Sequence, residues 1–251
     1  MDLGIRGRVA AVTGGAHGIG RAIARALAAE GARVFIADVS RDNLRAAVEG
    51  TDILSAEVDL LDRRACADWV AQVERDAGGA IGILVNNVGG TTHFTPKPLE
   101  DVPDEEWDRI TRLNLEPMFF TCRAAVPGMK RAGFGRIVNI SSGAGLKASI
   151  HPVQAYGIAK HGVVGFTRIL AAELGRFGIT ANSVAPGLVL TSANRERQWK
   201  NYGEAGQAAL LNRIALRRLA TAEDVARAVL FFASDLAGMV TGEVIQVGGT
   251  I

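Results

Sequence analysis

The sequence predicts an α/β fold in which a doubly wound sheet of seven parallel strands carries helices on both faces. Short apolar runs alternate with longer amphipathic stretches along the whole chain, the pattern typical of repeated strand–helix–strand units. The apolar runs lack strict alternation with polar residues, so each strand is expected to be covered on both sides. The 251 residues contain no internal repeat, low-complexity tract or linker, and we therefore predict one domain over residues 1–251.

Each strand is predicted from a short run rich in β-branched and other apolar residues. The first is the run Val9–Thr13, which precedes a group of glycines. Six further runs have the same character and lie at residues 33–38, 53–59, 83–87, 136–141, 180–185 and 244–247. A doubly wound sheet of this kind is Rossmann-like, and its ligands lie beyond the carboxyl ends of the strands.

The helices are predicted from apolar residues spaced three and four apart and from signals at the helix ends. In the stretch 20–30, Ile23, Ala26 and Leu27 share one face. Five more helices are expected after Ser40 and at residues 62–77, 103–130, 153–177 and 221–234. Residues 188–218 are polar and irregular, and we predict that they form a lid over the substrate.

Composition excludes several classes of function. The 28 basic and 26 acidic residues nearly balance, which argues against nucleic-acid binding. No apolar run approaches the ~20 residues that span a bilayer, and the start of the chain has no signal-peptide core, so we expect a cytoplasmic protein without a membrane partner. The two cysteines are far apart, and no Cys, His and Asp residues have metal-ligand spacing, so no metal is expected.

The glycines after the first predicted strand favour a dinucleotide. Gly14, Gly18 and Gly20 allow a tight turn and close approach of a pyrophosphate, and the next helix presents its free N–H groups there. His17 and Ile19 lie in the same turn and are expected beside the cofactor. A glycine-rich turn without a ligand is the alternative.

Side chains after the next strands extend the predicted cofactor site. Asp38 can accept hydrogen bonds from both hydroxyls of a ribose and would repel a 2′-phosphate, so NAD is preferred over NADP; a helix cap or a solvated carboxylate is the alternative. Asp59 and Leu60 could hold the adenine edge, and an aspartate that simply ends the strand is the alternative. Asn87 and Gly89 follow the fourth strand and place an amide and a small residue near the cofactor, and a simple turn is the alternative.

Four residues form the predicted catalytic group. Tyr156 and Lys160 are spaced i, i+4 and therefore share a helix face. A neighbouring ammonium should lower the pKa of the phenol from its ordinary value near ~10. Ser142, at the end of the preceding strand, can hydrogen-bond the substrate oxygen, and Asn114 could hold a water next to Lys160. The Tyr–Lys spacing also occurs by chance.

With these residues in place, the sequence resembles the short-chain dehydrogenase/reductase family over nearly its whole length. The matching pieces, in family order, are Thr13-Gly14-xxx-Gly18-Ile19-Gly20, Asp59, Asn86-Asn87-x-Gly89, Asn114, Ser142, Tyr156-xxx-Lys160, Asn182 and Pro186-Gly187. The resemblance implies that Tyr156 is the acid/base, that Lys160 holds the nicotinamide ribose and that Ser142 polarises the carbonyl. It also implies that Asn114 completes a proton relay, that Val189 and Thr191 lie near the carboxamide, and that the enzyme is a homotetramer.

The substrate pocket is less defined by the sequence. Its predicted wall includes His93, Lys147, His151, Val153 and Trp199. Lys147, His151, Arg195 and Arg197 could attract a carboxylate or phosphate, although solvated loop charges are the alternative.

The predicted function is NAD-dependent interconversion of a small-molecule secondary alcohol and its ketone. A cis-diol dehydrogenase and a reductase of 3-oxoacyl thioesters are alternatives with the same chemistry. An NAD-binding protein without catalysis is an alternative of another class, but it would have no need of all four residues of the catalytic group.

Overall fold

A computed structural model describes residues 2–91, 96–149 and 153–249 of the chain. Its strands are β1 (Val9–Thr13), β2 (Arg33–Asp38), β3 (Leu54–Glu57), β4 (Ile83–Asn86), β5 (Gly135–Ile140), β6 (Ile179–Pro186) and β7 (Val244–Val247). Its α-helices are α1 (Gly18–Ala29), α2 (Arg41–Val48), α3 (Arg63–Ala77), α4 (Asp104–Ala132), α5 (Gln154–Leu174), α6 (Ala193–Asn201), α7 (Gly203–Arg213) and α8 (Ala222–Ala233).

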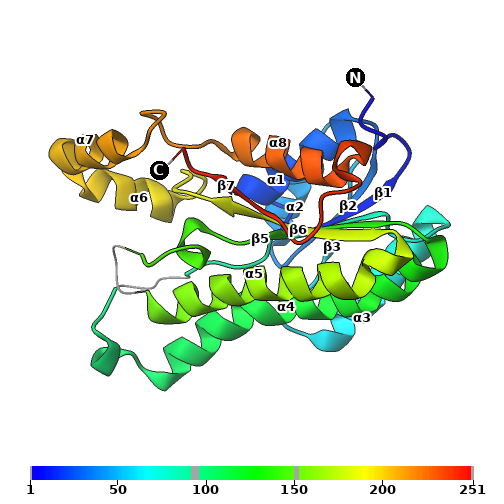
Figure 1. The fold of residues 1–251 in the computed structure, drawn as a ribbon, viewed down its shortest axis with the longest axis horizontal. Coiled ribbons are helices and arrows are strands. Elements are labelled where there is room, and N and C mark those ends of the chain that lie inside the picture. Colours follow the sequence, from blue (N-terminus) through cyan, green and yellow to red (C-terminus); the bar gives the residue numbers. More distant parts are fainter. Residues whose placement is uncertain (1, 92–95, 150–152, 250–251) are drawn as a thin grey trace.

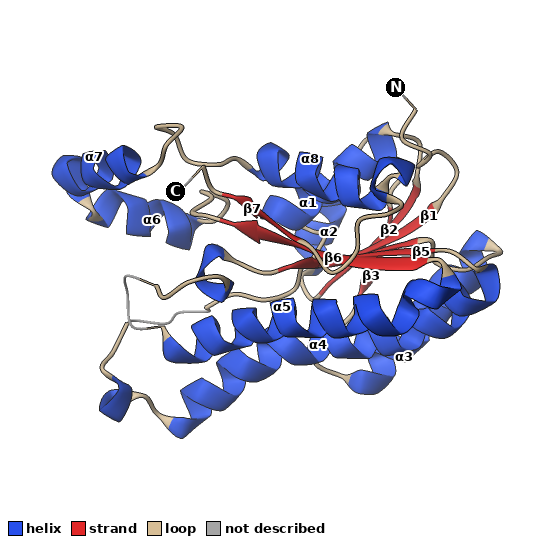
Figure 2. Cartoon of the chain, viewed as in Figure 1, coloured by secondary structure: helices blue, strands red, loops and turns tan. Residues whose placement is uncertain are grey.

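The described residues form a seven-stranded sheet in the order β3-β2-β1-β4-β5-β6-β7, with every pair parallel, which confirms the predicted doubly wound fold. Helices α1, α2 and α8 cover one face, and α3, α4 and α5 cover the other (Figure 1). Figure 2 shows the strands enclosed between these two helical layers. The central strands are buried because both of their faces meet a helix.

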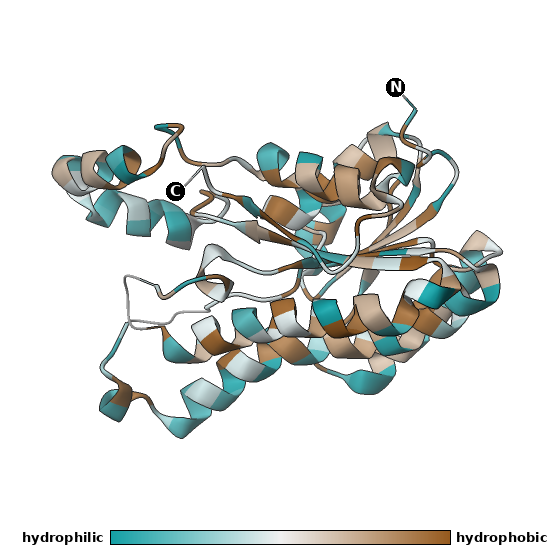
Figure 3. Cartoon of the chain, in the orientation of Figure 1, coloured by the Kyte–Doolittle hydropathy of each residue, from teal (hydrophilic) through white to brown (hydrophobic). Residues whose placement is uncertain are grey.

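Two apolar clusters hold the layers together, one on each face of the sheet. Ile23 and Leu27 of α1 pack in the first cluster, and Val73 of α3 and Met129 of α4 pack in the second, all at 1% exposure or less. Figure 3 shows the apolar colouring concentrated where helices meet the sheet, whereas α6 is largely hydrophilic. The predicted shared face of α1 is therefore confirmed.

The lid segment differs from its predicted form. Residues 188–218 are not irregular, because most of them form α6 and α7. Ser192 caps α6 by accepting a hydrogen bond from the backbone N–H of Arg195 at 3.3 Å. No residue of α7 is buried, so these helices depend on local capping and on each other rather than on a covered apolar face.

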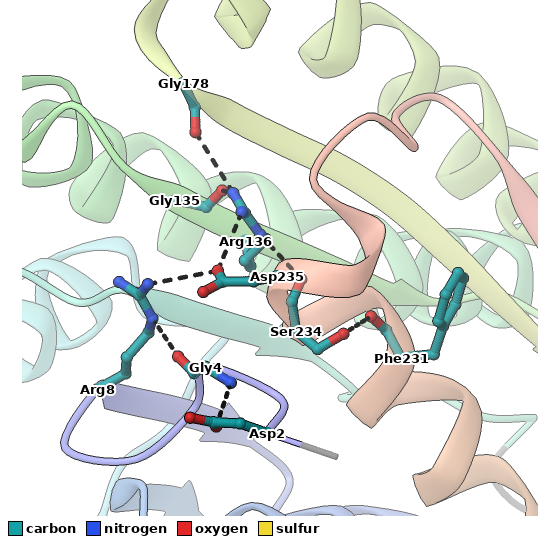
Figure 4. A network of polar contacts seen from close by, with 9 residues as sticks. All are labelled: Asp2, Gly4, Arg8, Gly135, Arg136, Gly178, Phe231, Ser234 and Asp235. Atoms are coloured by element: carbon teal, nitrogen blue, oxygen red, sulfur yellow. Dashed lines mark hydrogen bonds and ion pairs between the residues drawn. The ribbon is translucent and has the colours of Figure 1, made fainter.

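A polar cluster fastens the amino ends of the strands, at the opposite edge from the predicted site (Figure 4). Arg136, at the start of β5 and only 6% exposed, donates to the carbonyl oxygen of Ser234 at 3.4 Å and lies 3.6 Å from a carboxylate oxygen of Asp235. Arg8 lies 3.4 Å from the same oxygen and donates to the carbonyl of Gly4 at 2.7 Å. The cluster therefore ties the amino-terminal segment to β5 and to the end of α8.

Candidate active site

Most of the predicted cofactor residues follow the carboxyl ends of β1, β2, β3, β4 and β6, and Ser142 follows that of β5. Strands β1 and β4 are neighbours in the sheet, but the chain leaves them toward opposite faces, to α1 and to α4. This change of direction opens a crevice above the strand ends, which is where ligands bind in doubly wound sheets.

The glycine loop between β1 and α1 is shaped so that only glycine fits. Gly14 and Gly18 have φ values of +62° and +53°, a region that favours glycine. A Cβ on Gly20 would overlap the carbonyl oxygen of Gly14. His17 is the exposed cap residue of α1 and makes no side-chain capping bond, so the first N–H groups of α1, including that of Ile19, remain open to an anion.

Asn87 braces this loop. Its side-chain amide donates to the carbonyl oxygens of Gly14 at 3.0 Å and Thr13 at 3.3 Å, and its backbone N–H donates to the Thr13 hydroxyl at 3.0 Å. These side-chain donors are used within the protein, so the visible role of Asn87 is to hold the loop in place. The predicted direct contact between Asn87 and the cofactor stays a prediction.

Asp38 ends β2 beside the glycine loop and is 7% exposed. One carboxylate oxygen accepts from the backbone N–H of Ala16 at 3.3 Å, and the other accepts from that of Ser40 at 3.2 Å. Two backbone donors fix the orientation of the carboxylate and leave further acceptor capacity on both oxygens. Asp38 is therefore held where a ribose could hydrogen-bond to it.

Asp59 and Leu60 follow β3 in different environments. The Asp59 carboxylate is exposed and accepts from the backbone N–H of Leu61 at 2.9 Å. Leu60 is 3% exposed and belongs to the core cluster that α3 and α4 share. Leu60 therefore has a visible packing role, and its place beside an adenine ring stays a prediction.

The structure brings the four residues of the predicted catalytic group close to one another, with Lys160 and Asn114 against Gly89. Lys160 lies one helical turn from Tyr156 on α5, with its Nζ 5.7 Å from the centre of the tyrosine ring. Ser142 hydrogen-bonds to the Tyr156 phenol. A Cβ on Gly89 would lie 3.0 Å from Lys160 Nζ and 2.5 Å from Asn114 Oδ1, so glycine is needed for this close approach.

Asn114 is 1% exposed on α4 and pairs with the backbone of Gly90. Its Oδ1 accepts from the Gly90 N–H at 2.9 Å, and its Nδ2 donates to the Gly90 carbonyl at 2.8 Å and to the Ile110 carbonyl at 2.8 Å. Both amide donors are used, and Oδ1 keeps one lone pair. The side chain thus positions the segment after β4, and its part in a water relay stays a prediction.

The electrostatics of the pair differ from the prediction. Burial raises the pKa of the Tyr156 phenol above its ordinary value, whereas the hydrogen bond from Ser142 and the positive charge of Arg195 oppose that rise. Lys160 points its ammonium at the carbonyl oxygen of Ile140, 3.0 Å away, rather than at the phenol oxygen. Burial also lowers the pKa of Lys160 to about 8. Burial is therefore the main influence on the phenol, and Lys160 is not among the groups that lower its pKa, contrary to the prediction.

The segment after β6 returns to the glycine loop. Pro186 ends β6, and the Gly187 N–H donates to the Val247 carbonyl at 2.9 Å. Val189 is 6% exposed and anchors the segment in the core. A Cβ on Gly18 would lie 3.0 Å from the Thr191 Cβ, so Thr191 is in close contact with the loop. Thr191 therefore lies beside the crevice, and the predicted place of Pro186, Gly187, Val189 and Thr191 near the cofactor stays a prediction.

The predicted substrate pocket is only partly described. His93 and His151 lie outside the described residues. Lys147 is exposed, Val153 precedes α5 as its half-buried cap residue, and Trp199 is half-buried on α6 with its carbonyl accepting from Gln207 of α7 at 2.8 Å. The contacts of Trp199 tie α6 to α7, and its role as a pocket wall stays a prediction.

A buried polar network beneath the site was not predicted. Asn86 donates to the Asn139 side-chain oxygen at 2.8 Å and accepts from the Thr121 hydroxyl at 2.6 Å, and Asn139 donates to the Thr167 hydroxyl at 2.9 Å. These residues connect β4 and β5 to α4 and α5, the helices that carry the predicted catalytic group. The sequence did carry a signal, because two asparagines stand within otherwise apolar strand runs. A buried strand tolerates such a side chain only when it is hydrogen-bonded.

The described part of the chain contains no group of three or more His, Cys, Asp or Glu side chains that could hold a metal ion. None of its helices is long and apolar enough to cross a membrane.

Comparison with known proteins identifies the family. A model of the family described as enoyl-(acyl carrier protein) reductase matches residues 14–250. The chain is 35% identical to a D-beta-hydroxybutyrate dehydrogenase of Cupriavidus necator, with 98% of each chain covered. It is 39% identical to an acetoacetyl-CoA reductase of Rhizobium meliloti, covering 96% of this chain and 97% of that one.

A solved structure of a short-chain type dehydrogenase/reductase from Mycobacterium ulcerans superposes with a TM-score of 0.91 at 31% identity. The match covers 98% of this chain and 90% of that one. Because the family model and these relatives match over nearly their full length, the chain belongs to the short-chain dehydrogenase/reductase family of oxidoreductases.

Proposed function

We propose that the protein interconverts a secondary alcohol and its ketone with NAD as the cofactor and Tyr156 as the acid/base. The observation that carries this proposal is a chain of close approaches at the strand ends: Ser142 bonds to the Tyr156 phenol, Lys160 lies beside the tyrosine ring, and Lys160 and Asn114 both lie against Gly89. A protein that only bound NAD would not need a half-buried phenol and a buried ammonium beside each other.

The crevice fits a dinucleotide. Its glycine loop admits no side chain at Gly20, the N-terminus of α1 is open to a phosphate, and Asp38 is fixed at the end of β2. When bound, the nicotinamide ring supplies the hydride acceptor or donor of the reaction. The residues Gly14, Gly18, Ile19 and Gly20 of this loop would hold the pyrophosphate.

Within that site, the chain itself handles the proton. In alcohol oxidation the deprotonated Tyr156 oxygen accepts the proton of the carbinol, and in ketone reduction the protonated phenol returns it. The Ser142 hydroxyl has a single donor, so it turns from the phenol to the substrate oxygen when it polarises the carbonyl. Lys160 places a positive charge beside the ring, and Asn114 keeps the Gly89–Gly90 segment close to both.

The rate of alcohol oxidation should rise with pH across about pH 6 to 10. Oxidation needs the phenolate, and because burial raises the pKa of Tyr156, only a small fraction is deprotonated near neutrality. Reduction needs the protonated phenol and should be flat until the group deprotonates, then fall. The kcat/KM values of both directions against pH test this; oxidation that is flat or falls over this range would contradict it.

Asp38 should set the preference for NAD. Its carboxylate would repel a 2′-phosphate. Arg41, at the start of α2, forms an ion pair with Glu57 at 2.6 Å. Asp38→Asn should shift the ratio of the dissociation constants of NADH and NADPH toward NADPH by about 10-fold. The constants are measured by the fluorescence of the reduced cofactors. Asp42→Asn, at an exposed carboxylate of α2, is the matched control, and an equal shift in both variants would reject the role of Asp38.

The same proton chemistry would serve a 3-oxoacyl thioester, the kind of substrate named in the Rhizobium relative, and a ring cis-diol. A panel of secondary alcohols, cis-diols and 3-hydroxyacyl thioesters, assayed by NADH absorbance at ~340 nm, separates these substrates. The predicted result is turnover of at least one class with NAD. Intact NADH binding without turnover of any class would instead favour a protein that only binds the cofactor.

We also propose a homotetramer in the cytoplasm. Large apolar side chains remain exposed on α4 and α5, namely Phe119 at 42%, Ile158 at 55% and Ile169 at 64%. Such side chains favour contact with another copy of the chain. Light scattering on the purified protein should give four times the chain mass of 26.4 kDa, and a monomer would contradict the proposal.

A further inference from the structure

The amino end of α6 lies against the active-site crevice. Thr191, two residues before this helix, touches Gly18 of the glycine loop, and Ser192 caps its first turn. Figure 1 shows α6 at the same end of the molecule as the first turn of α5, which carries Tyr156. Arg195 is in the first turn of α6 and is half-buried. The helix therefore presents a cation at the mouth of the crevice.

The charge of Arg195 reaches the predicted reacting group. Burial is the main influence on the pKa of Tyr156, and Arg195 is the one cationic side chain among the groups that oppose this rise. Lys160 is not among them, although it lies on the same helix as Tyr156. The position of α6 next to the glycine loop and this influence on the phenol together place Arg195 close to where a substrate would be held.

The polar partners of Arg195 leave room for an anion. Its Nη1 donates to the Gln198 side-chain oxygen at 2.9 Å, and Gln198 donates in turn to the Tyr202 hydroxyl at 3.2 Å. Within residues 2–91, 96–149 and 153–249, no carboxylate forms an ion pair with Arg195. Other partly buried cations do have one, such as Lys97 with Glu106 at 2.7 Å.

The charges near Tyr156 also favour an anionic substrate. Lys160 Nζ lies 5.7 Å from the centre of the Tyr156 ring and the charge of Arg195 also acts on the phenol, whereas the carboxylate of Asp38 is hydrogen-bonded to the backbone of Ala16 and Ser40. A planar guanidinium with several open donors matches the two oxygens of a carboxylate. An anionic substrate would neutralise this positive charge, whereas a neutral alcohol would leave it unmatched.

We propose that Arg195 binds a carboxylate of the substrate, so that the preferred substrates are hydroxy acids with a secondary carbinol and the corresponding oxo acids. This inference rests on the proposed function, because it concerns the substrate of the same site. The competing role for Arg195 is contact with a cofactor phosphate, since Thr191 lies against the glycine loop. The two roles differ in what Arg195→Met changes: substrate selection in the first, NADH affinity in the second.

The experiment compares matched substrates. Secondary 2-, 3- and 4-hydroxy acids and their neutral primary amides are assayed with NAD, and the ratio of kcat/KM for each acid to that of its amide is measured. We expect at least one acid to exceed its amide by about 10- to 100-fold, the range for a hydrogen-bonded charge pair. Arg195→Met should bring that ratio close to one with the dissociation constant of NADH unchanged, and Arg195→Lys should retain part of it.

Arg213→Met is the matched control, because Arg213 is an exposed arginine at the last residue of α7 and should leave the ratio unchanged. Equal use of acids and amides by the unmodified enzyme would overturn the inference and leave the proposed function standing. Weaker NADH binding by Arg195→Met with an unchanged ratio would overturn it in favour of the phosphate role. Intact NADH binding without turnover of any acid, amide or neutral alcohol would overturn the proposed function, and this inference with it.

Discussion

Replacing Tyr156 with phenylalanine should lower kcat by about 10²- to 10⁴-fold, the contribution of a positioned acid/base group. The substitution removes one hydroxyl from a side chain that hydrogen-bonds to Ser142 and lies one helical turn from Lys160. The glycine loop and Asp38 are untouched, so the dissociation constant of NADH should stay within a few-fold of its original value. Steady-state kinetics and NADH fluorescence measure the two quantities.

Two further measurements make this result specific to proton transfer. The melting temperature of Tyr156→Phe should be close to that of the unmodified protein, because the aromatic ring and its packing are retained. The residual activity should also lose the rise with pH described for alcohol oxidation, since the titrating group is gone. A variant that keeps full kcat would remove Tyr156 from the mechanism, and a variant that cannot bind NADH would indicate a structural defect instead.

Gly20→Ala should weaken NADH binding by roughly 100-fold. The added Cβ would overlap the carbonyl oxygen of Gly14 and lie 2.7 Å from the amide nitrogen of Asn87, which braces the loop. The first neighbour is backbone, and the second is a side-chain amide already held by hydrogen bonds to Thr13 and Gly14, so the loop itself must move. Titration of the protein with NADH, followed by fluorescence, gives the affinity.

Gly79→Ala is the matched control for this change. A Cβ on Gly79 meets no atom within 4 Å, and the residue lies between α3 and β4, away from the crevice. We expect NADH binding by this variant to be unchanged. If Gly20→Ala also bound NADH normally, the glycine loop would not be the cofactor site.

Much of the fold could be predicted because the sheet is buried on both faces. Each predicted strand corresponds to an observed strand, and the largest difference in bounds is at β3, which is shorter than the run 53–59. The order of apolar runs and helices placed the polar residues at the carboxyl ends of the strands. The sequence alone therefore brought Ser142, Tyr156 and Lys160 to one place, since strand ends and helix faces follow from simple periodicity.

Helices α6 and α7 could not be predicted from the periodicity of apolar residues. Helix α7 buries no residue, and α6 is largely hydrophilic, so neither carries the apolar stripe by which a helix is recognised in a sequence. The remaining signal was local. Ser192 is a residue type that caps helices. In the structure its hydroxyl accepts a hydrogen bond from the Arg195 N–H and begins α6.

The electrostatics of Tyr156 depend on distances that spacing does not give. An i, i+4 pair shares a helix face, but the Lys160 ammonium extends to the Ile140 carbonyl and leaves burial as the main influence on the pKa of Tyr156. Arg195, some 40 residues along the chain, opposes that influence instead. Burial in the folded protein thus raises the pKa of Tyr156, which the neighbouring ammonium was expected to lower.

The most direct test of the account follows the hydrogen of the carbinol carbon. The protein is incubated with NAD and a panel of secondary alcohols carrying deuterium at that carbon, and the reduced cofactor is analysed by mass spectrometry. We expect at least one alcohol to yield deuterated NADH, and we expect Tyr156→Phe to yield little or none in the same time. Absence of deuterated NADH with every alcohol of the panel, or equal yield from Tyr156→Phe, would contradict the proposed function.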